Sequence, residues 1–471
     1  MQWTIDQILK ATGGRLLYGL SGTRFEGVGI DSRTVRDDQL FVAICGERHD
    51  GHTFIDQVIE KGVRGLAIQA ETAAKLHHDQ WQAKGATCIE VPDTIRALGA
   101  LAAFQRRRSA IPVVAITGSN GKTTTRQMTA LVVAQRFNTL TTQGNFNNEI
   151  GLPLTLFHLS PEHEAAVLEL GMNHPGEIQR LGAICQPTIG VITNVGPAHL
   201  EFLGSLEGVA RAKGELIPQV DAQGTVILNR DDDHVAALAV SADRKVLFFG
   251  TRPDAQVRAQ GIDTTGQGIA FELVSPGAKV QVGLKTPGRF MVANALAAAA
   301  VGHAMGLTAE QIKAGLETFV SAKGRLNVVE TARGIHIIDD TYNANPDSMA
   351  AAFDTLSALS KDRAGMIVVG DMLELGEQSE RLHHQVGQRA ARSGAARLYA
   401  YGQFAEAVSE GAQFAGMDGA KIFTGDKAAI AVDLIDHLST GDWVLIKGSR
   451  GMAMETVVEA VRIWADGPPT V

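Results

Sequence analysis

The sequence predicts an α/β protein of three domains: a small mixed α/β domain, a central parallel-sheet domain and a C-terminal Rossmann-like domain. The chain has 471 residues, about three times the usual domain length. In two successive blocks, short apolar runs that end in glycine-rich or polar loops alternate with helical stretches. This alternation is typical of buried parallel strands joined by helices. A shorter block with mixed helix and strand signals precedes both.

The leading block, residues 1–85, contains helix and strand signals in close succession. It predicts an amphipathic helix over residues 4–11, strands near residues 25–30 and 40–44, a helix from about Phe54, and a strand over residues 65–68 that closes the unit. A strand ending near Val91 is followed by Pro92-Asp93, a favourable helix start. We expect the three arginines at 106–108 to complement the dipole at the end of that helix.

The central block spans residues 86–322 and the last block residues 323–471. Strand-to-loop runs in the central block are PVVAIT before GSNGKTT, AAVLEL before GMN, TIGVIT before NVGPAH, and GTVILN before RDDD. The last block repeats the pattern with IHIID, GMIVVGD, ARLYAYG and DWVLIKGS. Ligands of such folds bind at the carboxyl ends of the strands, so the residues that follow each run are the candidates for a site.

Charge and composition exclude several classes of function. The chain carries 43 Lys and Arg against 51 Asp and Glu, a net charge of −8. A protein that grips nucleic acid or membrane phosphates broadly needs an excess of positive charge, so we expect neither partner. The most apolar stretch, residues 291–306, is shorter than the roughly 18 to 20 residues of a membrane span.

The cysteines and the amino terminus indicate a cytoplasmic protein. Cys45, Cys88 and Cys185 are far apart and match neither a metal motif nor an even-numbered disulfide framework, which favours a reducing compartment. The first residues, MQWTIDQILKATGG, lack a basic segment followed by an apolar one, so no secretory signal is predicted.

The strongest local motif is GSNGKTT at residues 118–124, between an apolar strand and a helix. Glycines let backbone N–H groups turn toward a phosphate, and the helix amino terminus adds positive potential. Lys122 would hold the β- and γ-phosphates and Thr123 would bind Mg²⁺. Ile116 stands where the common motif has its first glycine, so an ordinary strand-to-helix turn is the alternative. The flanking strand and helix favour the nucleotide site, and so a central domain of the P-loop type.

Three further polar residues follow strand ends of the central block. Glu169 ends AAVLEL, where its carboxylate would reach the same metal as the loop. His199 follows the next strand, and Lys213 lies 14 residues later. A lone His is more often structural and a lone Lys more often solvated. Because all three residues follow strands that end at the same edge of the sheet, a shared functional site is as good an interpretation as these structural roles.

The last candidates lie around the change from the central to the C-terminal block. Asn294 sits in a small-residue helix, where close packing is the alternative interpretation. Arg325 is suited to stabilising γ-phosphate charge from a neighbouring domain, although linker arginines are often solvated. Asp339 and Asp340 end a strand, where paired acids either bind ribose hydroxyls or begin a turn.

These motifs, taken together, resemble the Mur ligase superfamily over nearly the whole chain. The similarity includes GIDSRTVRDDQLFVAICGERHDGHTFI, TGSNGKTTT, NVGPAHLEFLGSLEGVARAKGE and VLIKGSRGM. The runs GNFNNEIG, LELGMNHPGEI, DTYNANP and GDMLELGEQS point to the member that adds D-Ala-D-Ala to a peptidoglycan precursor. The resemblance implies an ATP-dependent carboxylate–amine ligase that forms an acyl phosphate on UDP-N-acetylmuramoyl-tripeptide, which D-Ala-D-Ala then captures. We expect the protein to be a monomer.

The resemblance assigns the ATP and metal site residue by residue. ATP would be bound by Gly118, Ser119, Asn120, Gly121, Lys122, Thr123 and Thr124, with Asn294 at the adenine and Asp340 at the ribose. Thr123 and Glu169 would hold one Mg²⁺. His199 would hold a second, supported by Lys213 as a carbamate formed with CO₂. Lys122 and Arg325 would balance the charge of the transferred phosphoryl group.

The same resemblance assigns the acceptor site to the first domain and its border. Uridine would be bound by Ser32, Arg33, Thr34, Arg48 and His49, and the sugar region by Asn145, Asn147 and Asn148. The C-terminal domain would contribute to ATP and dipeptide binding. One departure occurs where relatives commonly read G-R-H-N and this chain has Gly288-Arg289-Phe290-Met291. We therefore expect Phe290 or Met291 to pack beside the adenine.

Three alternatives remain for the function. A folylpolyglutamate synthase uses similar chemistry, but such relatives begin almost directly with the phosphate-loop domain, without a small leading domain that carries DSRTV. A P-loop GTPase switch needs a guanine-reading NKxD motif, and Ser321-Ala322-Lys323 is only a chance-level match. A non-catalytic nucleotide-binding scaffold would need no acid, His and Lys at successive strand ends.

Overall fold

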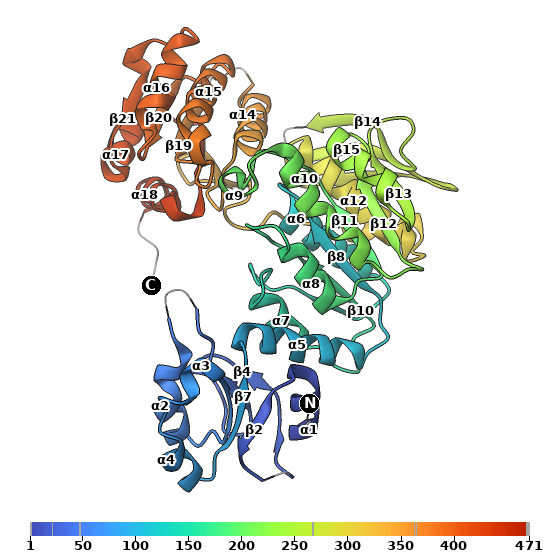
Figure 1. Cartoon of the computed structure of the whole chain (residues 1–471). Helices are drawn as coiled ribbons and strands as arrows, with labels where there is room; N and C mark the ends of the chain where they lie inside the picture. The colour runs from blue at the N-terminus through green and yellow to red at the C-terminus, as the bar shows by residue number, and fades with distance from the viewer. Residues whose placement is uncertain are drawn as a thin grey trace.

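The computed structural model describes residues 2–467 apart from 21, 47, 48, 266, 267, 362 and 364, and the side chains of 241 and 265 are also left out. The chain forms three α/β regions, each around its own main sheet (Figure 1). The middle region, which runs from teal through green to yellow in Figure 1, lies between the blue amino-terminal region and the orange-red carboxyl-terminal region along the chain. The predicted fold class is confirmed.

The first region contains a five-stranded sheet in the order β2-β7-β6-β5-β4. These strands are Arg15–Tyr18 (β2), Val28–Gly29 (β4), Leu40–Val42 (β5), Gly65–Gln69 (β6) and Thr87–Val91 (β7), and only β2 is antiparallel to its neighbour. A two-stranded ribbon of Trp3–Thr4 (β1) and Arg24–Phe25 (β3) adjoins it. The helices are Ile5–Thr12 (α1), Gly51–Phe54 (η1), Ile55–Glu60 (α2), Ala70–Ala73 (α3) and His78–Ala83 (α4).

The expectation that the strand at residues 65–68 closes this unit was wrong. β6 is an inner strand, because β7 pairs with β6 on one side and with β2 on the other. The sheet therefore continues beyond residue 85. The apolar run TCIEV belongs to the first core, as do Ala97, Leu98 and Leu101 of the helix that follows it and makes the connection to the middle region.

Helix α5 (Thr94–Arg107) makes that connection. The Asp93 side chain caps it by accepting a hydrogen bond of 2.9 Å from Arg96 N. At the other end, Arg106 is buried, contrary to the expected role of the arginines at the helix terminus. Its guanidinium donates to backbone carbonyls of other segments, including Cys185 O at 2.9 Å and Ile111 O at 3.1 Å. Tertiary packing thus recruits one of the three arginines, while Arg107 stays exposed.

The middle region contains a nine-stranded sheet in the order β16-β15-β14-β13-β12-β11-β8-β10-β9. Its strands are Val113–Thr117 (β8), Thr139–Thr141 (β9), Ala165–Glu169 (β10), Ile189–Ile192 (β11), Thr225–Asn229 (β12), Lys245–Gly250 (β13), Val257–Thr265 (β14), Gly268–Ser275 (β15) and Ala278–Leu284 (β16). Neighbours from β9 to β14 pair in parallel, as predicted for β8 and β10 to β12. The antiparallel β14–β16 meander adds an edge that was not predicted.

Helices cover this sheet and hold the segments that follow its strands. They are Lys122–Val133 (α6), Gly151–Leu156 (α7), Glu177–Cys185 (α8), Leu200–Leu203 (α9), Leu206–Gly214 (α10), Ile217–Gln219 (η2), Asp233–Ala237 (α11), Leu238–Ser241 (η3), Phe290–Ala304 (α12) and Ala309–Glu317 (α13). α12 contains the most apolar stretch of the sequence. It is buried and packs against α6, with Gly302 close to Val132. No helix of the described part of the chain is long and apolar enough to cross a membrane.

The third region contains a six-stranded sheet in the order β17-β18-β22-β19-β20-β21, in which only β17 is antiparallel. The strands are Asn327–Glu330 (β17), His336–Asp340 (β18), Met366–Gly370 (β19), Arg397–Tyr401 (β20), Ile422–Thr424 (β21) and Trp443–Lys447 (β22). The helices are Pro346–Ser360 (α14), Gly376–Gln378 (η4), Ser379–Arg392 (α15), Ala405–Phe414 (α16), Gly419–Lys421 (η5), Lys427–His437 (α17), Arg450–Met452 (η6) and Glu455–Asp466 (α18). Asp340 at the carboxyl end of β18 and Lys447 at the carboxyl end of β22 line a cleft together with residues of the middle region.

Candidate active site

The glycine-rich loop turns from the end of β8 into the first turn of α6. Gly118 and Gly121 have φ values of 152° and 77°, which L-residues with side chains rarely adopt. A Cβ at Gly118 would overlap the Thr193 hydroxyl, and a Cβ at Gly121 would overlap the Asn294 carboxamide. Both positions therefore require glycine for conformation and for space. This is the backbone arrangement that a phosphate-binding loop needs.

The segment after β11 holds the loop in place. Asn194 Oδ1 accepts a hydrogen bond of 2.7 Å from Asn120 N, and Thr193 Oγ1 donates to Asn120 O at 2.7 Å. Ser119 Oγ donates to Gly196 O at 3.1 Å. The loop is thus fixed by hydrogen bonds from a neighbouring strand end.

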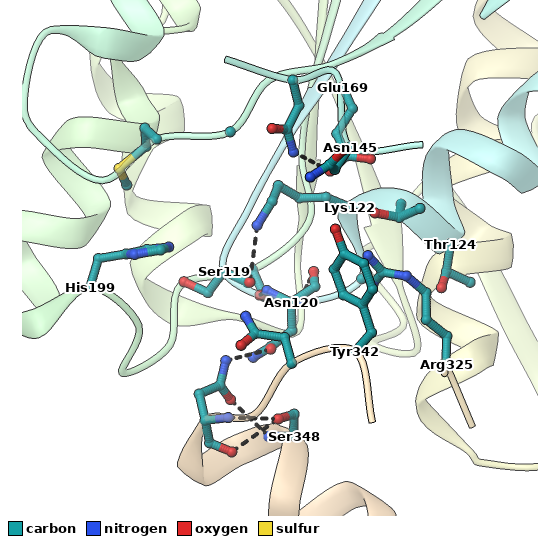
Figure 2. A pocket seen from close by; sticks show the side chains of 18 of the residues that line it. Ser119, Asn120, Lys122, Thr124, Asn145, Glu169, His199, Arg325, Tyr342 and Ser348 are labelled. Carbon is teal, nitrogen blue, oxygen red and sulfur yellow. Dashed lines mark hydrogen bonds between the residues drawn. The ribbon is translucent and has the colours of Figure 1, made fainter. Parts of the chain in front are cut away.

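Lys122 folds back over the loop in Figure 2. Its Nζ donates to Gly118 O at 2.7 Å and to Ser119 O at 3.2 Å. Burial, with a smaller contribution from the positive charge of Arg325, lowers the pKa of Lys122, and Glu169 opposes that shift. The amine therefore donates to two backbone carbonyls in this structure. The oxygens of a bound phosphate are charged and would accept stronger hydrogen bonds from it.

Asn294 approaches the loop from α12. Its Oδ1 accepts a hydrogen bond of 3.2 Å from Thr125 Oγ1, and the residue is buried. Thr123 and Thr124 in the first turn of α6 are buried as well. Phe290 and Met291, at the start of α12, both line the cleft beside them. The assignments of Asn294, Phe290 and Met291 to adenine remain predictions.

Glu169 ends β10 beside Lys122 and is only 2% exposed (Figure 2). Asn147 Nδ2 donates to its Oε1 at 2.8 Å. The other oxygen, Oε2, lies 3.9 Å from Arg126 Nε, and neither of these two atoms has a hydrogen-bond partner among the described residues. A buried carboxylate oxygen without a hydrogen bond, next to a phosphate loop, is a suitable ligand for Mg²⁺.

The other candidate metal ligands are more dispersed. Among the residues that the structure describes, no group of three or more His, Cys, Asp or Glu could hold a metal ion by itself. His199 precedes α9 with a left-handed φ of 56°, and its Nδ1 donates to Glu374 Oε2 at 2.6 Å. Hydrogen bonding from His199 lowers the pKa of Glu374. A metal here would therefore complete its coordination with water or phosphate oxygens.

Lys213 lies in α10 and is 1% exposed. Burial, together with the charge of Lys122, lowers its pKa well below the ordinary lysine value. No hydrogen bond to its amine is found in the described part of the chain. A buried lysine without a counter-charge favours the neutral amine.

The third region supplies the far wall of the cleft. The Arg325 guanidinium stacks on the Tyr342 ring, 4.0 Å from its centroid (Figure 2). Asp340 accepts hydrogen bonds from Leu326 N at 3.0 Å and from the buried Lys447 Nζ at 2.6 Å. Asn345 Nδ2 donates to Asn120 Oδ1 of the phosphate loop at 2.7 Å. Residues of two regions are thereby in direct contact at the loop.

A cleft of about 1040 Å³ brings most of the predicted residues together. Those that line it are Ser119, Asn120, Gly121, Lys122, Thr123, Thr124, Asn145, Asn147, Asn148, Glu169, His199, Asn294, Arg325 and Asp340. Gly118 shapes the loop beneath it, and Lys213 is buried outside its lining. Ser32, Arg33, Thr34 and His49 do not line this cleft, and Arg48 lies outside the described residues.

Several polar residues at the cleft were not singled out from the sequence. Asn194, Tyr342, Asn345 and Lys447 line it, and Glu374 contacts His199. All five lie in runs that carried the resemblance, NVGPAHLEFLGSLEGVARAKGE, DTYNANP, GDMLELGEQS and VLIKGSRGM, so a signal was present without a role for the individual residue. Asn194 directly follows the strand run TIGVIT, which marks it as a strand-end residue.

Family models match all three regions of the chain. The Mur ligase family catalytic domain matches residues 24–106, the Mur ligase middle domain residues 116–302, and the Mur ligase glutamate ligase domain residues 324–450. A full-length relative, the UDP-N-acetylmuramoyl-tripeptide–D-alanyl-D-alanine ligase of Escherichia coli strain K12, is 39% identical over 465 residues, 98% of each chain. The chain belongs to the Mur ligase family.

Solved structures agree with this membership. A crystal structure of MurF from Acinetobacter baumannii has a TM-score of 0.89 and 35% identity, covering 98% of this chain and 99% of that one. MurF from Thermotoga maritima in complex with ADP has a TM-score of 0.82 and 29% identity, covering 93% of this chain and 97% of that one. The three-domain Mur ligase architecture, ATP-dependent ligase chemistry and nucleotide binding thus extend to this member of the family.

Proposed function

We propose that this Mur ligase joins D-Ala-D-Ala to UDP-N-acetylmuramoyl-tripeptide with hydrolysis of ATP to ADP and phosphate. The observation that carries the proposal is one cleft in which a phosphate-loop lysine, a buried strand-end carboxylate and an arginine of the third domain meet: Lys122, Glu169 and Arg325. Similarity to the ligase of Escherichia coli over 98% of both chains supports the same substrates.

The chemistry explains why such a cleft is needed. A carboxylate is a poor electrophile, so the acceptor must first receive a phosphoryl group, which ATP supplies, to form an acyl phosphate. The amine of the dipeptide then forms the amide and releases phosphate. Two anions must approach each other in the first step, and Lys122 and Arg325 reduce their repulsion. Tyr342 holds the Arg325 guanidinium at the edge of the cleft for this purpose.

Two Mg²⁺ sites are part of the proposal. Thr123 and Glu169 would hold one ion, and the unpaired Glu169 Oε2 supports this assignment. His199 would hold the second, supported by Lys213 as a carbamate. A neutral amine is the form that reacts with CO₂, and burial favours that form of Lys213. The carbamate would replace a buried cation by an anion that attracts the metal.

The substrate assignments divide the chain by domain. ATP would lie on the loop from Gly118 to Thr124, with Asn294 at its adenine and Asp340 at its ribose. The first domain, with Ser32, Arg33, Thr34, Arg48 and His49, would bind uridine, and Asn145, Asn147 and Asn148 the sugar. We assign the first domain, whose sheet extends through β7 to Val91, to uridine binding, the following residues up to 322 to the ATP domain, and 323–471 to ATP and dipeptide binding. We further propose that the protein is cytoplasmic, which its three free cysteines support, and that it is a monomer.

The decisive test follows the acceptor oxygen. With ¹⁸O in the tripeptide carboxylate, one label is expected in the released phosphate, and phosphate release is expected only when both the UDP-precursor and D-Ala-D-Ala are present. Unlabelled phosphate would exclude the acyl phosphate. Steady ATP hydrolysis without either substrate would favour a nucleotide switch or scaffold, and glutamate transfer to a folate would favour a folylpolyglutamate synthase.

A further inference from the structure

A loop of the third domain reaches His199 of the middle domain. This loop follows β19, and its Glu374 accepts the hydrogen bond of 2.6 Å from His199 Nδ1. Glu374 O also accepts from Glu201 N at 3.3 Å, which ties the same loop to α9. Glu374 has a left-handed φ of 62°. The two residues meet although the whole of β12 to β19 separates them in the chain.

The third domain determines where Glu374 lies. Each of the three residues before it is anchored by a hydrogen bond to a different segment of that domain. Asp371 accepts from Gln403 N at 2.7 Å, Met372 N donates to His383 Nε2 at 2.9 Å, and Leu373 N donates to Ser449 Oγ at 2.9 Å. The carboxylate is therefore presented by a rigid support, and it contacts His199 only when the third domain is docked as in this structure.

The contact selects one tautomer of His199. An ionised carboxylate has no proton to donate, so the ring nitrogen that faces it, Nδ1, must carry the hydrogen. The other nitrogen, Nε2, then keeps its lone pair, and it has no hydrogen-bond partner among the described residues. A histidine held in this way by a carboxylate is the form that binds metal ions in proteins.

We propose that Glu374 is a positioning residue that fixes the metal-binding tautomer of His199 and so couples docking of the third domain to divalent-cation binding at that histidine. The inference rests on the proposed function, which assigns a metal to His199. Glu374 does not line the cleft, so it acts through His199 and not on the substrates. The loop sequence GDMLELGE thereby gains a role in the ATP site.

The test measures Mn²⁺ binding to the full-length protein with ADP by electron paramagnetic resonance, together with the ¹⁵N shifts of the His199 ring. Glu374→Ala is expected to weaken the affected Mn²⁺ site about 10- to 100-fold and to abolish the preference for hydrogen on Nδ1. Glu374→Gln, whose amide oxygen still accepts from Nδ1, is expected to restore most of the affinity. Glu377→Ala, an exposed acid of the same loop, is the matched control and should match wild type.

A second short variant guards against misfolding. Glu374→Asn tolerates a positive φ but its side chain is too short to reach His199, so it should reproduce the Ala result. The proposal would be overturned if both short variants kept the wild-type Mn²⁺ affinity and the wild-type tautomer of His199. It would also be overturned if X-ray scattering showed that the third domain of a variant is no longer docked while its Mn²⁺ affinity is unchanged. The variant His199→Ala distinguishes a failure of the metal assignment from a failure of the role of Glu374. If it also binds Mn²⁺ normally, the metal assignment of the proposed function fails, whereas if it alone loses affinity, only the role of Glu374 fails.

Discussion

Asn345 at the start of α14 bridges to Asn120 in the phosphate loop through a hydrogen bond of 2.7 Å from Nδ2 to Oδ1. The same asparagine caps α14, because its Oδ1 accepts from Ser348 N at 2.9 Å. One side chain thus ends a helix of the third domain and joins that domain to the nucleotide loop. The two roles can be separated by substitution.

Asn345→Ser is expected to keep the helix cap and lose the bridge, because serine is a good N-cap but too short to reach Asn120. One hydrogen bond contributes about 0.5–1.5 kcal/mol, so the equilibrium constant for docking of the third domain should fall about two- to tenfold, and the docked fraction should fall with it. Fluorescence energy transfer between labels on the middle and third domains measures this fraction. Asp426→Ala, which removes only the cap of α17, should leave it unchanged, and equal transfer in Asn345→Ser and wild type would refute the bridge.

Gly121→Ala is expected to weaken ADP binding at least about tenfold, equivalent to about 1.4 kcal/mol. Alanine is disfavoured at a φ of 77°, and its methyl group would overlap the Asn294 carboxamide, so the loop must shift. Gly85→Ala is the matched control. Gly85 has a φ of 78° with nothing within 4 Å of the added Cβ, so it carries the backbone cost alone. Calorimetric titration with ADP should separate the two, and equal affinities would remove the steric part of the explanation.

Lys213→Ala is expected to abolish nearly all turnover, since no carbamate can form. A short carboxylic acid such as acetate should restore part of the activity by supplying the missing anion. Lys245→Ala, at an exposed position, should turn over like wild type. The assay is coupled ADP release with and without added acid, and in CO₂-depleted buffer for the unmodified enzyme. Full activity of Lys213→Ala without additive would take this lysine out of the mechanism.

Arg106→Met is expected to destabilise the protein by about 3 kcal/mol or more, because it removes the charged donors of a buried side chain from four backbone carbonyls. Arg107→Met on the exposed side of the same turn should stay within about 0.5 kcal/mol of wild type. Urea unfolding followed by circular dichroism gives both values. Similar midpoints for the two variants would return Arg106 to the helix-end role that the sequence predicts.

Iodoacetamide at pH 8 is expected to label Cys45 and to spare the other two cysteines of the native protein. Burial raises the pKa of Cys88 and of Cys185 to about 12, and the thiolate is the reactive form. In the unfolded chain both thiols ionise near about 8.5, so above that pH the unfolded state binds fewer protons and stability falls as pH rises toward 12. Peptide mass spectrometry identifies the labelled sites, and labelling of Cys185 in the native protein would contradict its burial.

The sequence predicted the parts of this molecule that depend on neighbouring residues. The phosphate loop was readable because glycines, lysine and a flanking strand and helix all lie within a few residues of Lys122. Glu169 was readable because a strand end is marked by the end of an apolar run. The β14–β16 meander also left a signal in the sequence, because apolar residues alternate with other residues along AKVQVGL of β16.

Contacts between distant segments were not readable in this way. Nothing in the local pattern around Glu374 or Asn345 indicates a partner in the middle domain, because each pair forms only when two separately folded sheets dock. Arg106 shows the same limit in a single turn. The helix-end rule treats all three arginines alike, and only the tertiary structure decides which one meets buried carbonyls.

The alanine-rich surface of α12 has a consequence for the cost of binding nucleotide. Alanine and glycine have no side-chain rotamers to lose, so the contact between α12 and α6 is rigid and loses no side-chain entropy when a ligand binds. The loop at the start of α6 is therefore preorganised for its ligand. The entropy lost when the complete site assembles therefore comes mainly from the third domain. Contacts with the substrates must offset the loss of its orientational freedom relative to the loop.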